Sequence, residues 1–254
     1  VVEIEINKLY LSIIGLVLMI VLVLLETYFP EREYTAKLKG RAYLTNLLVF
    51  GFNNSIFIAF NIASVSLIAY SYRLHNSFDL LPVWGQAILG VLLLDFFIWL
   101  WHLSNHKIDF LWRFHKAHHS EQFLNATSAL RFHLGELLLS VLIKSVILIV
   151  FGISFWIFVL YEVLVTFFAA FHHSNIRLPK WFQLYLERFI ISPNMHRTHH
   201  SALRDEHDSN YGVIFSWWDL LFKTFDDRQP KNIGLVNISE KTFFNFLLFP
   251  FRKK

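Results

Sequence analysis

The sequence predicts an all-α integral membrane protein with about four transmembrane helices and a histidine-rich helical cap. Hydrophobic residues make up 55% of the 254 residues, and the mean hydropathy is +0.45. Four apolar stretches are long enough to cross a bilayer, which takes about 20 residues of helix. Two copies of the pattern H-x-x-H-H lie on either side of the last stretch.

The first three stretches differ in how far polar residues interrupt them. Leu9 to Phe29 is the cleanest, and because it ends without a small-residue cleavage site we interpret it as a retained span. Leu44 to Tyr72 is longer and is interrupted by three asparagines. Val83 to Trp101 ends in aromatic residues and contains Asp95.

The fourth stretch, Gly135 to Phe171, is nearly twice the length of one crossing and has Gly152 near its middle. We expect two helices folded into a hairpin, because a single crossing would put the two H-x-x-H-H patterns on opposite sides of the membrane. Lys144 lies inside this hairpin, where a charge is costly unless it snorkels or pairs. The sequence does not identify its partner.

Lysine and arginine near span ends collect on the cytoplasmic side of membranes. The first connection, Pro30 to Tyr43, carries four of them, and alternation then places residues 102–134 on the cytoplasmic side as well. We expect one cytoplasmic cap, built from residues 102–134 and 172–254, within a single domain that spans residues 1–254. In the cap, an amphipathic helix is expected at Lys180 to Ile191, and the aromatic-rich segment Lys241 to Phe251 is expected at the membrane interface.

Composition excludes several classes of function. The chain has no cysteine, so disulfides, iron–sulfur clusters and thiolate metal sites within it are excluded. The net charge of +4 is spread over the loops without the basic block typical of nucleic-acid binding. Trp217 and Trp218 are interpreted first as anchors at the membrane interface.

The histidine spacing predicts metal binding. Residues three and four apart lie on one face of a helix, with Cβ atoms about 5–6 Å apart. Two triplets and one pair satisfy this condition: His115, His118 and His119; His196, His199 and His200; and His102 with His106. Neutral imidazole suits zinc, copper, iron and nickel. Eight such ligands exceed the four of one tetrahedral zinc site, which favours two metals.

Six motifs occur in a specific order between Asp95 and Thr224, over about half of the chain. They are D-x3-W-x2-H-x3-H from Asp95, W-R-F-H-K-A-H-H from Trp112, R-F-H-x-x-E from Arg131, H-H-S-N from His172, S-P-N-M-H-R-T-H-H from Ser192, and N-Y-G from Asn210 followed by W-W-D-x-L-F. This stretch resembles the fatty acid hydroxylase/sterol desaturase superfamily of membrane di-iron enzymes. One departure is Trp99, where family members often have tyrosine.

The resemblance implies nine metal ligands: His102, His106, His115, His118, His119, His173, His196, His199 and His200. Candidates for an additional ligand, or for groups that orient the ligating imidazoles, are His172, His133, His207, Asp95, Glu136, Asn175, Asp208 and Asn210.

Several of these candidates have a second interpretation. Glu136 can instead pair with Arg131, and Asp95 can be a satisfied polar group inside the bundle. His133 and His207 can be hydrogen-bonded histidines at the cap surface. Asn210 either contacts the metal centre or the substrate, or fixes a turn.

The resemblance also implies the chemistry: two iron ions, O2 as co-substrate, and electrons from a separate reductase or carrier, since no flavin or nicotinamide fingerprint is present. The predicted reaction is hydroxylation of a C–H bond in a fatty acyl, sterol or related lipid taken from the bilayer. Desaturation and ether-lipid (alkylglycerol-type) monooxygenation are alternatives. A membrane metal-binding protein without oxygen chemistry is an alternative of another class, and zinc can displace iron in overexpressed protein.

Overall fold

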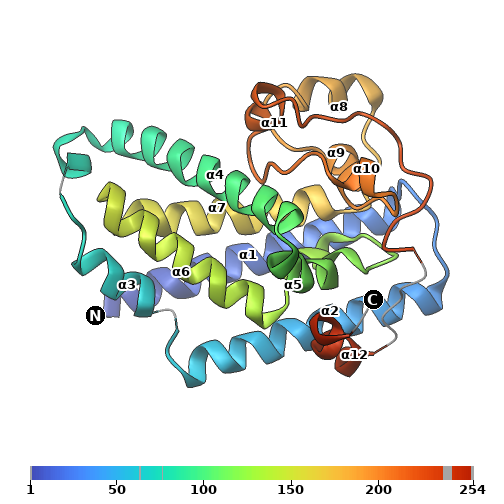
Figure 1. Ribbon diagram of the computed structural model, residues 1–254, viewed down its shortest axis with the longest axis horizontal. Helices are drawn as coiled ribbons and strands as arrows, with labels where there is room; N and C mark the ends of the chain where they lie inside the picture. Colours follow the sequence, from blue (N-terminus) through green and yellow to red (C-terminus); the bar gives the residue numbers. More distant parts are fainter. Residues whose placement is uncertain (1, 63, 76, 237–241, 253–254) are drawn as a thin grey trace.

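The computed structural model describes residues 2–62, 64–75, 77–236 and 242–252, and this part of the chain contains helices and no β-strand. The long helices lie roughly side by side, and the short helices from residue 180 to 221 gather at one end of the bundle, in orange to red (Figure 1). The prediction of an all-α protein is confirmed.

Among the described residues, four helices are long and apolar enough to cross a membrane, which is the predicted number. They are α2 (Ala36–Ala59), α4 (Val83–Lys107), α6 (Leu134–Phe151) and α7 (Phe155–His173). The first apolar stretch belongs to α1 (Val2–Tyr28), whose side chains are described from Gly15 on, and the Gly15–Tyr28 part of this helix is a shorter apolar segment.

The prediction of one span from Leu44 to Tyr72 is wrong. The helix begins earlier, because Thr35 caps it by accepting a hydrogen bond from the Leu38 amide (3.3 Å), and it ends at Ala59. Asn61 then adopts a left-handed conformation (φ 49°), which asparagine tolerates better than most residues. A separate short helix, α3 (Ser64–Ser71), follows and packs against α6.

The predicted hairpin is present. Gly152 ends α6 with φ 62°, and a Cβ at this position would lie 2.2 Å from the carbonyl oxygen of His75, so only glycine fits the turn. Lys144 finds its partner on the returning helix, since its Nζ lies 2.7 Å from Oε1 of Glu162. Buried apolar side chains from α4, α6 and α7 form the main core of the bundle.

The cap contains α5 (Asp109–His119), η2 (Ala126–Leu130), α8 (Lys180–Leu186), α9 (Pro193–His199), α10 (Arg204–His207), α11 (Trp217–Leu221), α12 (Phe243–Leu248) and η3 (Phe249–Phe251). The helix expected at Lys180 to Ile191 is shorter than predicted, because the chain leaves α8 after Leu186 and Ile190 bridges to Phe215.

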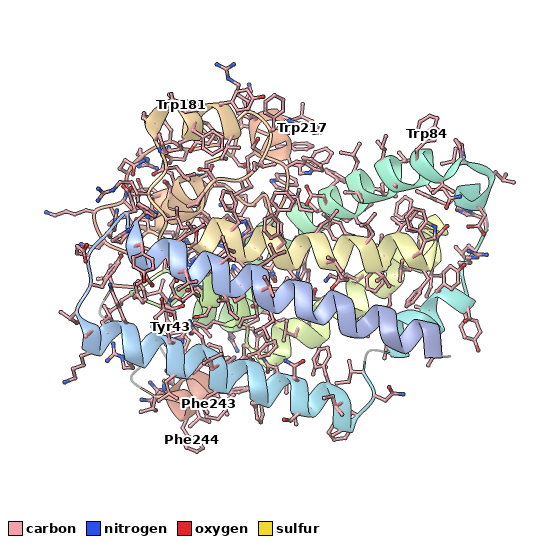
Figure 2. All side chains as sticks on the ribbon, turned by 180° about the vertical axis from the view of Figure 1, so that it is seen from behind. Tyr43, Trp84, Trp181, Trp217, Phe243 and Phe244 are labelled. Atoms are coloured by element: carbon pink, nitrogen blue, oxygen red, sulfur yellow. The ribbon has the colours of Figure 1, made fainter. Side chains whose placement is uncertain are left out.

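Aromatic side chains of the cap divide between its interior and its surface. Trp181, Trp217 and Phe244 point outward (Figure 2). Phe246 is instead buried in a cluster with Val49 of α2, so the C-terminal segment is partly anchored on the bundle. Lys241 lies outside the described residues.

Candidate metal centre

The nine predicted ligand histidines come together in two buried groups. The first, the five-His group, consists of His102, His106, His115, His119 and His199. The second, the four-His group, consists of His118, His173, His196 and His200. Within each group, one ring nitrogen from every residue lies within 4.8 Å of the others.

Each H-x-x-H-H pattern contributes to both groups. His115 and His119 lie four residues apart on one face of α5, whereas His118 points about 100° from His119 and about 60° from His115 around the helix axis. Helix α9 repeats the arrangement, with His196 and His200 in the four-His group and His199 in the five-His group. The side chain of Ser192 caps α9 by accepting a hydrogen bond from the Met195 amide (3.1 Å), with Pro193 in the first turn.

The distances between nitrogens suit a shared metal ion. Nε2 of His115 lies 3.1 Å from Nε2 of His102 and 3.1 Å from Nε2 of His119. In the four-His group, Nε2 of His173 lies 3.0 Å from Nε2 of His118 and 2.9 Å from Nε2 of His196. Two nitrogens that bind one ion at about 2.1 Å and at right angles are about 3.0 Å apart.

Unpartnered buried nitrogens support the same interpretation. Nε2 of His106 and Nε2 of His199 are buried and have no hydrogen-bond partner among the described residues. A buried polar atom without a partner is costly, and native structures rarely keep one. The two atoms belong to the five-His group, so a metal ion there would satisfy both.

Acceptors on the outer side of the rings fix their orientation. Nδ1 of His102 donates to the carbonyl of Tyr211 (2.8 Å), and Nδ1 of His199 donates to that of Ser209 (2.7 Å). Nδ1 of His118 donates to the carbonyl of Arg131 (3.1 Å). A proton held on Nδ1 leaves the lone pair of Nε2 free for a metal.

Two predicted carboxylates take part in this orientation. Oε1 of Glu136 lies 2.8 Å from Nδ1 of His115, and Oδ1 of Asp208 lies 3.3 Å from Nδ1 of His106. Asp95 forms no hydrogen bond with a histidine among the described residues. Its oxygens accept hydrogen bonds from Tyr161, Trp218 and two backbone amides, so it is a satisfied polar group inside the bundle.

A family model described as fatty acid hydroxylase matches residues 87–224, which is more than half of the chain and includes every histidine of both groups. The chain belongs to the fatty acid hydroxylase family. The ornithine lipid hydroxylase OlsE of Rhizobium tropici is 29% identical over 196 residues, which cover 76% of this chain and 58% of the relative.

Human alkylglycerol monooxygenase is 28% identical over 182 residues, covering 68% of this chain and 39% of that protein. A cholesterol 25-hydroxylase-like protein of Danio rerio is 30% identical over 143 residues, which cover 56% of this chain and 55% of that protein. The chain therefore spans between about two fifths and three fifths of the length of these relatives. No solved structure matches the chain.

The remaining candidate histidines of this fatty acid hydroxylase family member lie outside the two groups. His133 caps α6, with Nδ1 accepting from the Gly135 amide (3.0 Å) and Nε2 donating to the Leu247 carbonyl (3.1 Å). Nδ1 of His172 donates to the carbonyl of Val213 (3.1 Å), although its ring lies 4.0 Å from that of His196.

His207 and the two candidate asparagines have mainly structural contacts. His207 stacks on Trp112 and, with His106 and Asp208, forms a third set of nearby ligand atoms. The side chain of Asn175 bonds both backbone groups of Arg32. Asn210 has φ 51° and donates to two carbonyls, so it fixes a turn.

Burial makes the imidazoles ready to bind metal. Desolvation and neighbouring histidines lower the pKa well below the usual value for five of them: His118, His119, His196, His199 and His200. These rings are therefore neutral at neutral pH, which is the protonation state that metal binding requires.

Sequence analysis missed two buried carboxylates that support the site. Oε2 of Glu26 accepts the amide of Asn175 (2.9 Å), directly after the His172-His173-Ser174 segment, and the amide of Ala126 (3.0 Å). Asp219 accepts the amides of Tyr211 (2.9 Å) and Gly212 (2.8 Å). A carboxylate within an apolar span was the available signal for Glu26.

Proposed function

We propose that this protein is a membrane-bound oxidoreductase that hydroxylates a C–H bond of a lipid with O2 at a centre of two iron ions. The observation that carries the proposal is the pair of convergent histidine groups, built from the same two H-x-x-H-H helices. Because each helix contributes to both groups, two ions bound there would be neighbours. Membership of the fatty acid hydroxylase family supports the reaction class.

The donor set favours iron over a structural zinc ion. A structural zinc site is closed by four ligands, whereas the first group offers five imidazoles. Imidazole suits iron, and the chain has no thiolate that would favour zinc or an iron–sulfur cluster. When bound, two irons would pass two electrons from the separate carrier to O2, which is the chemistry that attack on an unactivated C–H bond requires.

The chain's own residues would orient the ligands and exclude water. All nine histidines are at least 91% buried, and Phe132 stacks on the ring of His118 at 4.5 Å. Glu136, Asp208 and four backbone carbonyls hold Nδ1 of six of the nine histidines, so that the Nε2 atoms of these six rings face inward. A dry and rigid site protects an oxidising centre from side reactions with solvent.

We propose that the substrate is a lipid that reaches the site from the bilayer along the apolar helices. The relatives are named for an ornithine lipid, for alkylglycerol and for cholesterol, which share a long apolar body. Hydroxylation next to an ether oxygen is a second candidate, favoured by the similarity to alkylglycerol monooxygenases of several animals. We also propose one domain over residues 1–254, a cytoplasmic cap and a separate electron carrier.

The test combines metal analysis of purified protein with mass spectrometry of host lipids. The protein is produced in iron-replete, zinc-poor cells, with the His118→Ala variant as the control. The proposal predicts iron in the wild type and a lipid that gains one oxygen atom only with the wild type. A lipid that loses two hydrogens would identify a desaturase. Bound zinc with an unchanged lipidome would overturn the oxygenase proposal and favour a metal-binding protein.

A further inference from the structure

The segment from Tyr211 to Phe215 runs beside the metal centre and presents its carbonyl groups to two histidines. The carbonyl of Tyr211 accepts from Nδ1 of His102 (2.8 Å), and that of Val213 accepts from Nδ1 of His172 (3.1 Å). In the described part of the chain, neither histidine forms a hydrogen bond with a carboxylate. The position of this segment therefore sets the orientation of both rings.

Two buried carboxylates hold the amides of the same segment. Asp219 accepts the amides of Tyr211 (2.9 Å) and Gly212 (2.8 Å), one on each carboxylate oxygen. Asp95 accepts the amides of Ile214 and Phe215, each at 3.2 Å, in the same way. Both aspartates are fully buried, so the segment is clamped at two points.

Asp219 is itself fixed to the helix that carries His102. Its Oδ1 accepts from Nε1 of Trp99 (3.0 Å), which lies three residues before His102 on α4, and from the hydroxyl of Thr224 (2.6 Å). A Cβ on Gly212 would lie 2.9 Å from Oδ2 of Asp219, so a glycine permits this close approach. The contacts form a closed loop from α4 through Asp219 and Tyr211 back to His102.

We infer that Asp219 is a positioning residue for the metal centre, acting through the backbone of Tyr211 on His102 of the five-His group. The inference rests on the proposed metal centre. The fixed carbonyl of Tyr211 keeps the proton of His102 on Nδ1 and aims Nε2 at the other ligands. Contacts of this kind to metal-ligating histidines contribute about 10–100-fold to metal affinity.

Replacement of Asp219 by asparagine breaks one of its two contacts to the segment, the one with the Gly212 amide, with little change in volume. Oδ1 accepts three hydrogen bonds and Oδ2 accepts one, so the amide nitrogen of asparagine would take the place of Oδ2. Its hydrogens would then face the amide hydrogen of Gly212. Two donors repel each other, and the segment moves away from His102.

Asp95→Asn is the matched control. Asp95 is equally buried and also holds two amides of the segment, but its half of the clamp supports Val213 and His172. A general loss of packing would affect the two variants alike. An effect through Tyr211 and His102 is specific to Asp219→Asn.

The experiment is a titration of chelator-stripped protein in detergent with Co²⁺ alone, followed by the Co²⁺ absorption spectrum and by thermal unfolding of the metal-free protein. The wild type is expected to bind two Co²⁺ ions. Asp219→Asn is expected to bind one of them at least tenfold more weakly, with an altered spectrum, and to bind the other with unchanged affinity. Asp95→Asn is expected to spare the affinity that Asp219→Asn lowers.

The outcomes separate this inference from the proposed function. A wild type that binds no Co²⁺ would refute the metal centre itself. Two ions bound with wild-type affinities in Asp219→Asn, or the same loss in both variants, would refute the positioning role and leave the metal centre intact. If Asp219→Asn does not fold, Trp99→Phe removes one donor to the same carboxylate. That variant should lower the affinity for one of the two Co²⁺ ions several-fold, and an unchanged affinity for both ions would overturn the inference.

Discussion

His118 and His119 are neighbours in the chain but belong to different histidine groups. Nε2 of His118 lies 3.0 Å from Nε2 of His173, whereas Nε2 of His119 lies 3.1 Å from Nε2 of His115. Successive residues of a helix point about 100° apart, so the two adjacent histidines of one H-x-x-H-H pattern face two different points. His199 and His200 repeat this division on α9.

Substitution of the two neighbours should therefore remove different metals. His118→Ala is expected to reduce binding at the four-His group and His119→Ala at the five-His group, each leaving about one iron per chain where the wild type has about two. Metal analysis of purified protein measures this ratio. His75→Ala, which changes an exposed side chain in a distant loop, is the control. Full iron content in both His118→Ala and His119→Ala would contradict the assignment of these neighbours to different histidine groups.

Glu136 should strengthen metal binding through His115. Its Oε1 lies 2.8 Å from Nδ1 of that ring, and the side chain is 6% exposed. Glu136→Ala removes the acceptor and is expected to lower the affinity for one metal ion by about 10–100-fold. Competition with a chelator of known affinity measures the change, with the exposed Glu33→Ala as the control. Equal affinities in the two variants would show that Glu136 only packs against the ring.

The Lys144–Glu162 pair should stabilise the hairpin of α6 and α7. Glu162→Gln leaves the mostly buried ammonium of Lys144 without its partner in an apolar helix, at a cost of about 2 kcal/mol or more. Thermal unfolding in detergent micelles measures the loss. The double variant Lys144→Met/Glu162→Gln should recover most of it, because no unpaired charge remains. A double variant as unstable as the sum of the single ones would rule out coupling.

The metal-free protein should lose stability in mild acid. The histidines with lowered pKa, His118, His119, His196, His199 and His200, stay neutral in the folded chain but take up protons near pH 6.5 when it unfolds. The unfolded state then binds more protons, so the free energy of unfolding falls below about pH 6.5, by up to about 1.4 kcal/mol per pH unit for each ring.

Two buried carboxyl groups act in the opposite sense. Burial raises the pKa of Glu121 and Asp219, so their protonation favours the folded state as the pH falls. Five imidazoles outnumber them, and the net loss should be visible in unfolding midpoints between about pH 7.5 and pH 5.5, one unit on either side of the pKa of an unfolded histidine. Bound metal should move the loss to lower pH, because it competes with protons for the rings. A midpoint that stays constant or rises in acid without metal would contradict this account.

The sequence was most informative where function depends on local spacing. The histidines of each H-x-x-H-H pattern are three and four residues apart, which is the spacing of one helix face. The convergence of His115 and His119 was therefore predictable from their positions. Gly152 inside a double-length apolar stretch likewise predicted the hairpin. The contact between His115 and Glu136 depends on how α5 meets α6, and the sequence left it as one of two alternatives.

Contacts between distant segments were not predictable. Asp95 and Asp219 both lie in recognised motifs, but nothing local indicates that both clamp the Tyr211–Phe215 segment. The span from Leu44 to Tyr72 was wrong because hydropathy does not detect the cap at Thr35 or the left-handed Asn61. Glu162 is 18 positions after Lys144, and only the register of the hairpin brings the two charges together.

Oxygen-isotope labelling of lipids tests the central claim most directly. Cells that express the wild type, or the His118→Ala and His199→Ala variants, are grown under ¹⁸O2, and their lipids are analysed by mass spectrometry. A lipid hydroxylase with a histidine-bound iron centre should place one ¹⁸O atom in a lipid of the wild-type cells and none in either variant. An identical lipid profile in all three, or a new hydroxyl group that carries no ¹⁸O, would contradict it.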